Sequence, residues 1–258
     1  MRLPKRIRRA ATQVLAQTGL GRLRTTHLPP GKPEPLDSLA TRVEKFPSMG
    51  GMEIGPFLQQ IGRSVPASSA VVEVGVWLGA GTAQLCHGVA ERRSRGEETP
   101  SIHCYDRWSA SRTEVAKAAI ADVRLTKGDD TLPWVIDALR PFGAEVYFHK
   151  GDLDFLEWTH GPVGAFILDA AKGPRQFVNM IRTFGPSWIP EETLVVLMDY
   201  HYHKMCGNES FACQERFIEA NSDHFSQVDL GVDEPGTTAA FTYTKALDFD
   251  RAFDMAGL

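Results

Sequence analysis

The segment Val71–Thr82, VVEVGVWLGAGT, constrains the fold of this chain more than any other. It begins as an apolar, β-branched run typical of a buried strand, and glycines follow at positions 75, 79 and 81 before a helix-like stretch. Glycine lets the backbone approach a ligand closely, and the first turn of the helix aims N–H groups at it. The segment therefore predicts a strand, a glycine turn and a helix that bind a nucleoside-bearing cofactor.

An alternation of strand-like and helix-like segments continues from there. Strands are expected at 71–76, 101–106, 144–149, 164–169, 194–199, 225–230 and 238–243. Helices are expected near 80–94, 112–124, 131–141, 173–184 and 209–221, and residues 38–65 are expected to form helices that lead into the core. Five strand–helix alternations followed by two closely spaced strands are typical of a doubly wound sheet with an antiparallel end. The sequence therefore predicts an α/β fold with a mostly parallel, seven-stranded sheet.

The first part of the chain has a different character. Residues 1–24 contain seven basic residues and no acidic one, and apolar residues at near-helical spacing predict a basic amphipathic helix over 4–18. A proline-rich linker, HLPPGKPEPLD, follows at 27–37. We expect a basic helix and linker over 1–37 and the main domain over 38–258. The basic helix is suited to a membrane surface or a partner protein, whereas the acidic remainder argues against nucleic acid.

Three further features bear on the compartment. The four cysteines form no CxxC pair, and the basic start is not followed by the apolar stretch of a secretory signal. No apolar run approaches the roughly 18 residues that span a bilayer. These features predict a reducing, cytoplasmic setting, with peripheral membrane contact left open.

The glycine segment resembles motif I of class I S-adenosylmethionine (SAM) methyltransferases, in which a hydrophobic run is followed by an acid, one residue and a glycine. The resemblance implies that Gly75, Gly79 and Gly81 approach the methionine part of SAM and that Glu73 holds its ammonium group, usually through water. Asp106, which ends the second strand, is then expected to hold the ribose hydroxyls. Asp152, after the third strand, is placed where such folds contact the adenine amine.

The fourth and fifth strands end in polar residues that face one edge of the sheet. Asp169 ends the fourth strand and Lys172 follows three residues later, while Asp199 ends the fifth strand. Two convergent carboxylates predict a Mg²⁺ or Ca²⁺ site formed by Asp169 and Asp199. A bound metal would lower the pKa of a substrate hydroxyl, and Lys172 would take its proton, with His201 as another candidate base.

These residues are similar to those of metal-dependent small-molecule O-methyltransferases, which include the macrocin O-methyltransferase-like and the catechol and caffeoyl-CoA types. In the catechol type the fourth strand ends Asp-x-x-Lys, which Asp169 and Lys172 match in spacing. The chain departs from the pattern at Tyr200, where Asp or Asn is usual, and at Ala171, near which the macrocin-like enzymes carry an acid or histidine. His201 or water would then complete the metal site.

Three alternatives remain open at this point. Tyr200 and Lys204, with Ser187 and the glycine turn, imitate an NAD(P)-dependent short-chain oxidoreductase. The side chains of His201, His203, Cys206 and Cys213 suggest zinc, although their spacing matches no common closed site. The third alternative is a SAM-binding module without catalytic activity.

The sequence thus predicts a SAM-dependent O-methyltransferase acting on a hydroxyl of a small molecule, a sugar, glycan or other natural product. The acceptor pocket is expected to come from residues 38–60, 107–113 and 200–213, since connecting segments carry most binding residues. The oligomeric state, including a homo-oligomer, is left open.

Overall fold

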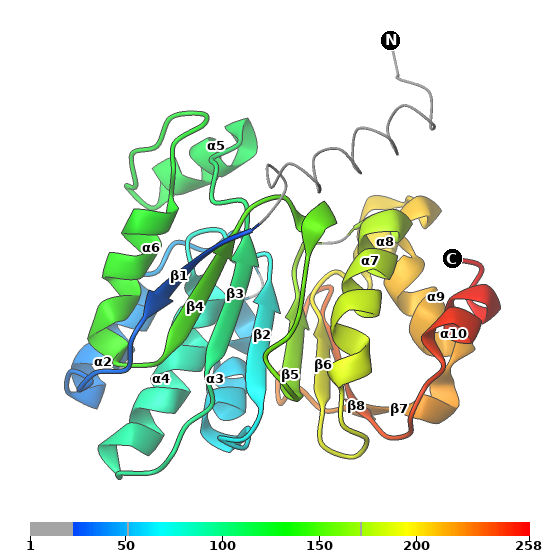
Figure 1. Cartoon of the computed structure of the whole chain (residues 1–258). Helices are drawn as coiled ribbons and strands as arrows, with labels where there is room; N and C mark the ends of the chain where they lie inside the picture. The colour runs from blue at the N-terminus through cyan, green and yellow to red at the C-terminus, as the bar shows by residue number, and fades with distance from the viewer. Residues whose placement is uncertain (1–22, 51, 171) are drawn as a thin grey trace.

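Figure 1 shows the computed structural model of the chain, which describes residues 23–50, 52–170 and 172–258. The basic helix predicted over residues 4–18 lies outside this part. In the described residues, one sheet of eight strands runs through the molecule in the order β1-β4-β3-β2-β5-β6-β8-β7. None of the described helices has the length and apolar character that crossing a membrane would require.

Five parallel strands form the centre of the sheet. They are β2 (Ala70–Val74), β3 (Ile102–Asp106), β4 (Val146–Lys150), β5 (Val163–Leu168) and β6 (Leu194–Leu197). From β2 the chain adds β3 and β4 on one side and β5 and β6 on the other, so the strand order reverses between β2 and β5. In open α/β sheets, ligands bind at such a reversal, beyond the carboxyl ends of the strands.

The far end of the sheet is antiparallel, as the sequence predicts. β8 (Ala239–Tyr243) pairs antiparallel with β6, and β7 (Phe225–Val228) pairs antiparallel with β8. All seven predicted strands are present, each within two residues of its predicted start and end. The doubly wound, mostly parallel architecture is therefore confirmed.

The number of strands is the part of the fold prediction that was wrong. β1 (Arg24–Leu28) adds an eighth strand that pairs antiparallel with β4, from Arg24 opposite Lys150 to Leu28 opposite Val146. The following residues are also tied to the sheet, because Gly31 N–H donates to Gly143 O and Glu34 N–H donates to Pro141 O. Part of the segment predicted as a free proline-rich linker is therefore an edge strand and its anchored continuation. The prolines after Leu28 end the strand, since proline cannot donate to a ladder.

Helices cover both faces of the sheet (Figure 1). The side chains that point to one face pack with α2 (Leu36–Glu44), α3 (Gly55–Ser64), α4 (Ala80–Ser94) and α6 (Leu132–Leu139). The alternate side chains pack with α7 (Pro174–Phe184), α9 (Cys213–Ala220) and α10 (Phe249–Met255). Neighbouring strand residues such as Val71 and Val72 thus belong to different halves of the core, as the period-two geometry of a strand requires.

Short elements complete the described chain. They are α5 (Arg112–Ile120), α8 (Tyr202–Cys206) and the 3₁₀ turns η1 (Met52–Ile54), η2 (Arg140–Phe142), η3 (Leu153–Phe155), η4 (Gly185–Ser187), η5 (Glu209–Phe211) and η6 (Ser222–His224). The sequence analysis missed α8 and α10. Between β4 and β5, where a doubly wound fold usually has a helix, residues 151–162 contain only η3.

Candidate functional site

The glycine turn after β2 is shaped by close packing against the end of β5. Gly75 has φ +93°, and a Cβ atom there would lie 2.4 Å from the carbonyl oxygen of Asp169. Gly79 has φ +84° and is the N-cap of α4, whose first turn has no side-chain cap and no acidic residue. Gly75 lies on the wall of the cofactor cavity described below. Gly79 instead provides the left-handed conformation from which α4 begins.

Glu73 is a buried carboxyl group next to this turn. Its Oε2 accepts a hydrogen bond of 2.5 Å from Thr82 Oγ1, and a Cβ atom on Gly81 would come within 2.4 Å of Oε1. Burial raises the pKa of Glu73 to about 8, against the smaller opposing effect of the Thr82 hydrogen bond; the charges of Asp169 and Asp106 add to the increase. Glu73 is thus mostly protonated near neutral pH, and a cation placed beside it would stabilise its ionised form.

Asp106 fastens two loops of the site through backbone hydrogen bonds. Its Oδ2 accepts from the N–H groups of Val76 at 2.8 Å and Trp77 at 2.9 Å, and its Oδ1 accepts from Trp108 N–H at 2.8 Å. Trp77 and Trp108 both have positive φ values, 49° and 43°, which non-glycine residues rarely adopt. Three of the roughly four acceptor positions of the carboxylate are therefore used to hold a strained backbone, a role that the sequence analysis missed.

A cavity of about 590 Å³ opens beyond the carboxyl ends of β2, β3 and β5. It is lined by Met49, Gly75, Trp77, Asp106, Arg107, Glu114, Asp152, Leu153, Asp154, Asp169, Ala170, Lys172 and Gln176. A small recess of about 40 Å³ continues inward to Glu73 and Gly81. We call the two together the cofactor cavity. Asp152 reaches its wall and also caps η3, accepting from Asp154 N–H at 3.0 Å.

Asp169, Lys172 and Asp199 lie together at one side of this cavity. Lys172 Nζ donates to Asp199 Oδ1 at 2.7 Å and lies 3.8 Å from the centre of the Tyr202 ring. The other Asp199 oxygen, Oδ2, is buried and has no hydrogen-bond partner within the described residues. The structure therefore brings together the three side chains that the sequence placed in one cluster.

Asp169 is reached by solvent from the cavity, yet protein atoms displace much of its hydration. This desolvation, and next the charge of Asp199, raise the pKa of Asp169 to about 7, while Lys172 opposes the increase. A carboxylate with this pKa is partly ionised at neutral pH and can accept a proton there.

A second cavity, of about 700 Å³, adjoins the first. We call it the acceptor cavity. It is lined by Met49, Gly50, Glu53, Asp169, Lys172, Met198, Asp199, His201, Tyr202, Lys204, Met205, Pro235, Gly236, Thr237 and Thr238. Met49, Asp169 and Lys172 border both cavities, so the two open onto one another at Asp169.

Seven of these fifteen residues lie in the predicted acceptor segments 38–60 and 200–213. The predicted segment 107–113 contributes none, and residues 235–238 were missed. Thr237 Oγ1 donates to Met198 O at 2.7 Å, and His201 N–H donates to Thr237 O at 2.9 Å. The Pro235-Gly236 pair indicates a turn, but no sequence signal places that turn beside β6; only the antiparallel pairing of β8 with β6 does so.

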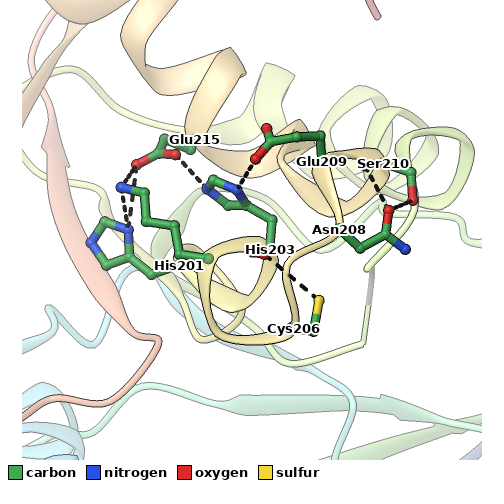
Figure 2. A network of polar contacts seen from close by, with 8 residues as sticks. His201, His203, Cys206, Asn208, Glu209, Ser210 and Glu215 are labelled. Atoms are coloured by element: carbon green, nitrogen blue, oxygen red, sulfur yellow. Dashed lines mark hydrogen bonds and ion pairs between the residues drawn. The ribbon is translucent and has the colours of Figure 1, made fainter.

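A polar network between α8 and α9 supports one wall of the acceptor cavity (Figure 2). Glu215 binds His203 Nε2 at 2.5 Å and also accepts from Lys204 Nζ. His201 Nδ1 lies 3.3 Å from Lys204 Nζ and 3.4 Å from Glu215. Burial and the charge of Lys204 lower the pKa of His201, so its imidazole is neutral at pH 7.

The structure gives no support for the predicted Mg²⁺ or Ca²⁺ site. Asp199 Oδ1 accepts a hydrogen bond from Lys172 Nζ at 2.7 Å, so this ammonium group lies where an ion bound to Asp199 would lie. An ion held by Asp169 and Asp199 would also have to take its other ligands from water or substrate. Where Asp or Asn is usual, Tyr200 is buried against Phe241. In the part of the chain that the structure describes, the group of three or more side chains that could bind a metal is a different one and contains neither Asp169 nor Asp199. The positive charge beside Asp199 is that of Lys172.

The short-chain oxidoreductase alternative is not supported by the structure. Tyr200 follows β6 and its side chain is buried, whereas Ser187 lies in η4, before β6, at the opposite edge of the sheet. The zinc alternative also fails among the described residues, because His203 is engaged by Glu215 and Glu209, while Cys213 is buried and donates to Lys172 O at 3.7 Å.

No family model matches the chain, and no curated protein matches it in sequence. Solved structures do match it. The calicheamicin methyltransferase CalS11 aligns over 95% of both chains with a TM-score of 0.51 and 14% identity. A second, apo structure of CalS11, described as a TDP-rhamnose 3'-O-methyltransferase, aligns over 95% of this chain and 97% of its own with a TM-score of 0.50 and 13% identity. The chain therefore has the class I methyltransferase fold, as the sequence predicts.

Proposed function

We propose that this protein transfers a methyl group from SAM to a hydroxyl group of a small molecule. The observation that carries the proposal is the junction of the cofactor and acceptor cavities at Asp169. A group-transfer enzyme needs its two substrates in separate pockets whose reacting ends meet, and the junction contains both a proton acceptor and a cation.

The cofactor cavity suits the chemistry of SAM. SAM supplies an electrophilic methyl group on a sulfonium ion, next to an amino acid end and a nucleoside. Glu73 at the inner recess is suited to the ammonium group, and the Gly75 turn allows close approach to the methionine part. Asp106 and Asp152 lie on the cavity wall for the ribose and the adenine. With three acceptor positions of Asp106 already used, we expect it to offer one position to a ribose hydroxyl.

Asp169 is the group best suited to take the proton of the acceptor hydroxyl. Its raised pKa lies near the operating pH, which is where a general base is most effective. Lys172 is bound to Asp199, and in this pairing its ammonium donates hydrogen bonds and stabilises the developing alkoxide. This assignment changes the predicted roles, since Lys172 becomes the stabilising cation and Asp169 the base. His201 is retained as a neutral side chain on the acceptor wall.

A sugar or related natural product is the acceptor class we propose. The acceptor cavity has polar groups on several sides, including Glu53, His201, Lys204 and Thr237, which suits a molecule with several hydroxyl groups. The same class is named for the two similar structures, one as a calicheamicin methyltransferase and one as acting on TDP-rhamnose. At their low identity these names support the class of acceptor but no particular compound.

Isothermal titration of the full chain with SAM, followed by methyl transfer to libraries of sugars and phenols, tests the proposal. We expect SAM binding and transfer to at least one hydroxylated acceptor. Absence of SAM binding would contradict the cofactor assignment. Binding without transfer to any acceptor would instead favour the non-catalytic module.

A further inference from the structure

Three histidine side chains gather on one face of β3 and β4, the face on which Tyr105 packs against Phe184 of α7. His103 lies on β3, His149 on β4, and His160 on the segment 151–162 that replaces a helix before β5. One ring nitrogen from each lies within 4.8 Å of the others, and they form the group of three potential metal ligands found in the described residues. Nothing in the proposed methyl transfer uses these side chains.

The two buried rings are held in position at their outer nitrogens. His103 Nδ1 and His149 Nε2 face one another at 3.0 Å. The opposite nitrogen of His103 lies 3.1 Å from Ser101 Oγ, and that of His149 lies 3.1 Å from Thr25 Oγ1. Metal-binding histidines commonly show this arrangement, in which the second ring nitrogen is fixed by a hydrogen bond.

Ring stacking fixes the same two side chains from the sides. His103 stacks on Tyr147 with centroids 4.7 Å apart, and His149 stacks on Tyr105 at 4.2 Å. These pairs follow the strand register, in which His103 is opposite Tyr147 and Tyr105 is opposite His149. The pair is thus built into the sheet, whereas His160 lies outside the sheet, is exposed, and contacts the ring of His103 at 4.6 Å between centroids.

The facing nitrogens of the pair already share a proton in the ion-free chain. His103 Nδ1 and His149 Nε2 form a hydrogen bond, so one of them carries the proton. Binding of both nitrogens to one ion needs that proton on the opposite nitrogen of its ring, where the hydroxyl oxygen of Ser101 or Thr25 can accept it.

We propose that His103 Nδ1, His149 Nε2 and a ring nitrogen of His160 bind one Zn²⁺-class transition-metal ion, with water in a fourth position. Zinc–imidazole distances of about 2.0–2.1 Å in a tetrahedral site place ligand nitrogens roughly 3.4 Å apart. The facing pair must therefore separate by only about 0.4 Å and rotate its lone pairs toward His160. Three imidazoles select zinc, cobalt, nickel or copper rather than Mg²⁺ or Ca²⁺.

The ion would join the segment 151–162 to the sheet. This segment begins with Asp152 and Leu153, which line the cofactor cavity, and Trp158 lies edge-on to both His103 and His160. Binding of His160 to the ion would restrict the motion of residues 151–162, which contain no α-helix. The site shares no residue with the proposed methyl-transfer site, so the two proposals can fail separately.

Cobalt is the probe, because tetrahedral Co²⁺ has visible d–d absorption that Zn²⁺ lacks. The full-length chain, treated with chelator and dialysed, is titrated with Co²⁺, then with Zn²⁺ by calorimetry, and with Mg²⁺ for comparison. His160→Gln is the test variant, since its side chain is exposed and glutamine is close to it in size. His27→Gln is the matched control, because His27 stacks on Tyr147 in the same aromatic row but lies outside the ligand group.

We expect one Co²⁺ per chain with a tetrahedral spectrum, its displacement by Zn²⁺, and no response to Mg²⁺. His160→Gln should weaken binding at least about tenfold, and His27→Gln should leave it unchanged. Zinc should also raise the Tm of the wild-type chain more than that of His160→Gln. The proposal is overturned if the wild-type chain binds no Co²⁺, if the spectrum is octahedral, or if His160→Gln binds as tightly as the wild type.

Discussion

Replacement of Glu73 by Gln tests whether this carboxyl group meets a cation when SAM binds. Burial raises its pKa to about 8, so at pH 7 the unliganded chain holds about 0.9 proton on this group. If the SAM ammonium comes beside it, the ionised form is stabilised and that proton is released. SAM binding should therefore release about 0.9 proton more from the wild type than from Glu73→Gln at pH 7.

Calorimetry in buffers of different ionisation enthalpy measures this proton release directly. At pH 9 Glu73 is already mostly ionised, so the difference between wild type and variant should fall to about 0.1 proton. The Asp169→Asn variant separates the contribution of the other group that titrates near pH 7. Equal proton release by wild type and Glu73→Gln at pH 7 would refute the placement of the ammonium group beside Glu73.

The raised pKa of Glu73 also predicts how the stability of the chain without cofactor depends on pH. A carboxyl group whose pKa is raised on folding stabilises the folded chain most below its unfolded pKa of 4.5, and that stability is lost as pH rises toward 8. Relative to its value at low pH, the free energy of unfolding of the wild type should therefore be lowered by Glu73 by about 3 kcal/mol at pH 7 and by less than about 1 kcal/mol at pH 5. The Tm of Glu73→Gln relative to wild type should rise by about 5–10 °C between these pH values. A pH-independent difference would show that Glu73 is ionised in the folded chain.

Three further predictions concern the turn, the base and the backbone anchor. Gly75→Ala should unfold the turn or abolish SAM binding, since its Cβ would lie 2.4 Å from Asp169 O. Gly96→Ala is the control, because Gly96 also has a positive φ but lies in open space. Tight SAM binding by Gly75→Ala would contradict the close packing. Asp169→Asn should lower the rate of methyl transfer about 10²–10⁴-fold and remove the rise in rate that the wild type shows through pH 7. A chelator should leave the activity of the wild type unchanged. Full activity of Asp169→Asn would exclude Asp169 as the base. Asp106→Asn should lower the Tm and weaken SAM binding together, whereas an unchanged Tm with lost binding would show that the carboxylate serves only the ribose.

The architecture could be read from sequence because its strands are buried on both faces. All six residues of β5 are buried, and such strands appear as continuous apolar runs between turn residues. β1 could not be read in this way. Four of its five residues are exposed, and the strand exists because β4 offers it an open edge, which is a long-range cause. Residues 27–37 therefore indicated a linker, although part of them is tied to the sheet.

In the candidate site, too, some features could be predicted from the sequence and others could not. Asp106, Asp169 and Asp199 could be predicted because each follows an apolar strand at the edge where ligands bind. Their partners could not, because the three backbone hydrogen bonds to Asp106 depend on left-handed conformations of Trp77 and Trp108. Lys172 was expected to act as a base, but its ion pair with Asp199 spans two strands that are adjacent only in the folded sheet.

The charges around the cofactor cavity lead to a last prediction, about how the product leaves. The charge of Asp169 adds to the raised pKa of Glu73, and the charge of Asp199 adds to the raised pKa of Asp169. Lys172 is paired with Asp199, so a cation that enters the unliganded cavity would stabilise the ionised carboxylates. SAM brings a sulfonium charge that its demethylated product lacks.

Once Asp169 is ionised, this charge difference should favour SAM over the product. Two unit charges about 4 Å apart attract by about 4 kcal/mol at an effective dielectric of 20, and the open cavity reduces this toward roughly tenfold in affinity. The ratio of product Kd to SAM Kd should therefore rise about tenfold from pH 5.5 to pH 8 in the wild type, and remain flat in Asp169→Asn. A ratio that does not change with pH in the wild type would mean that the sulfonium lies away from Asp169, and the reaction centre would then have to be placed elsewhere along the junction of the two cavities.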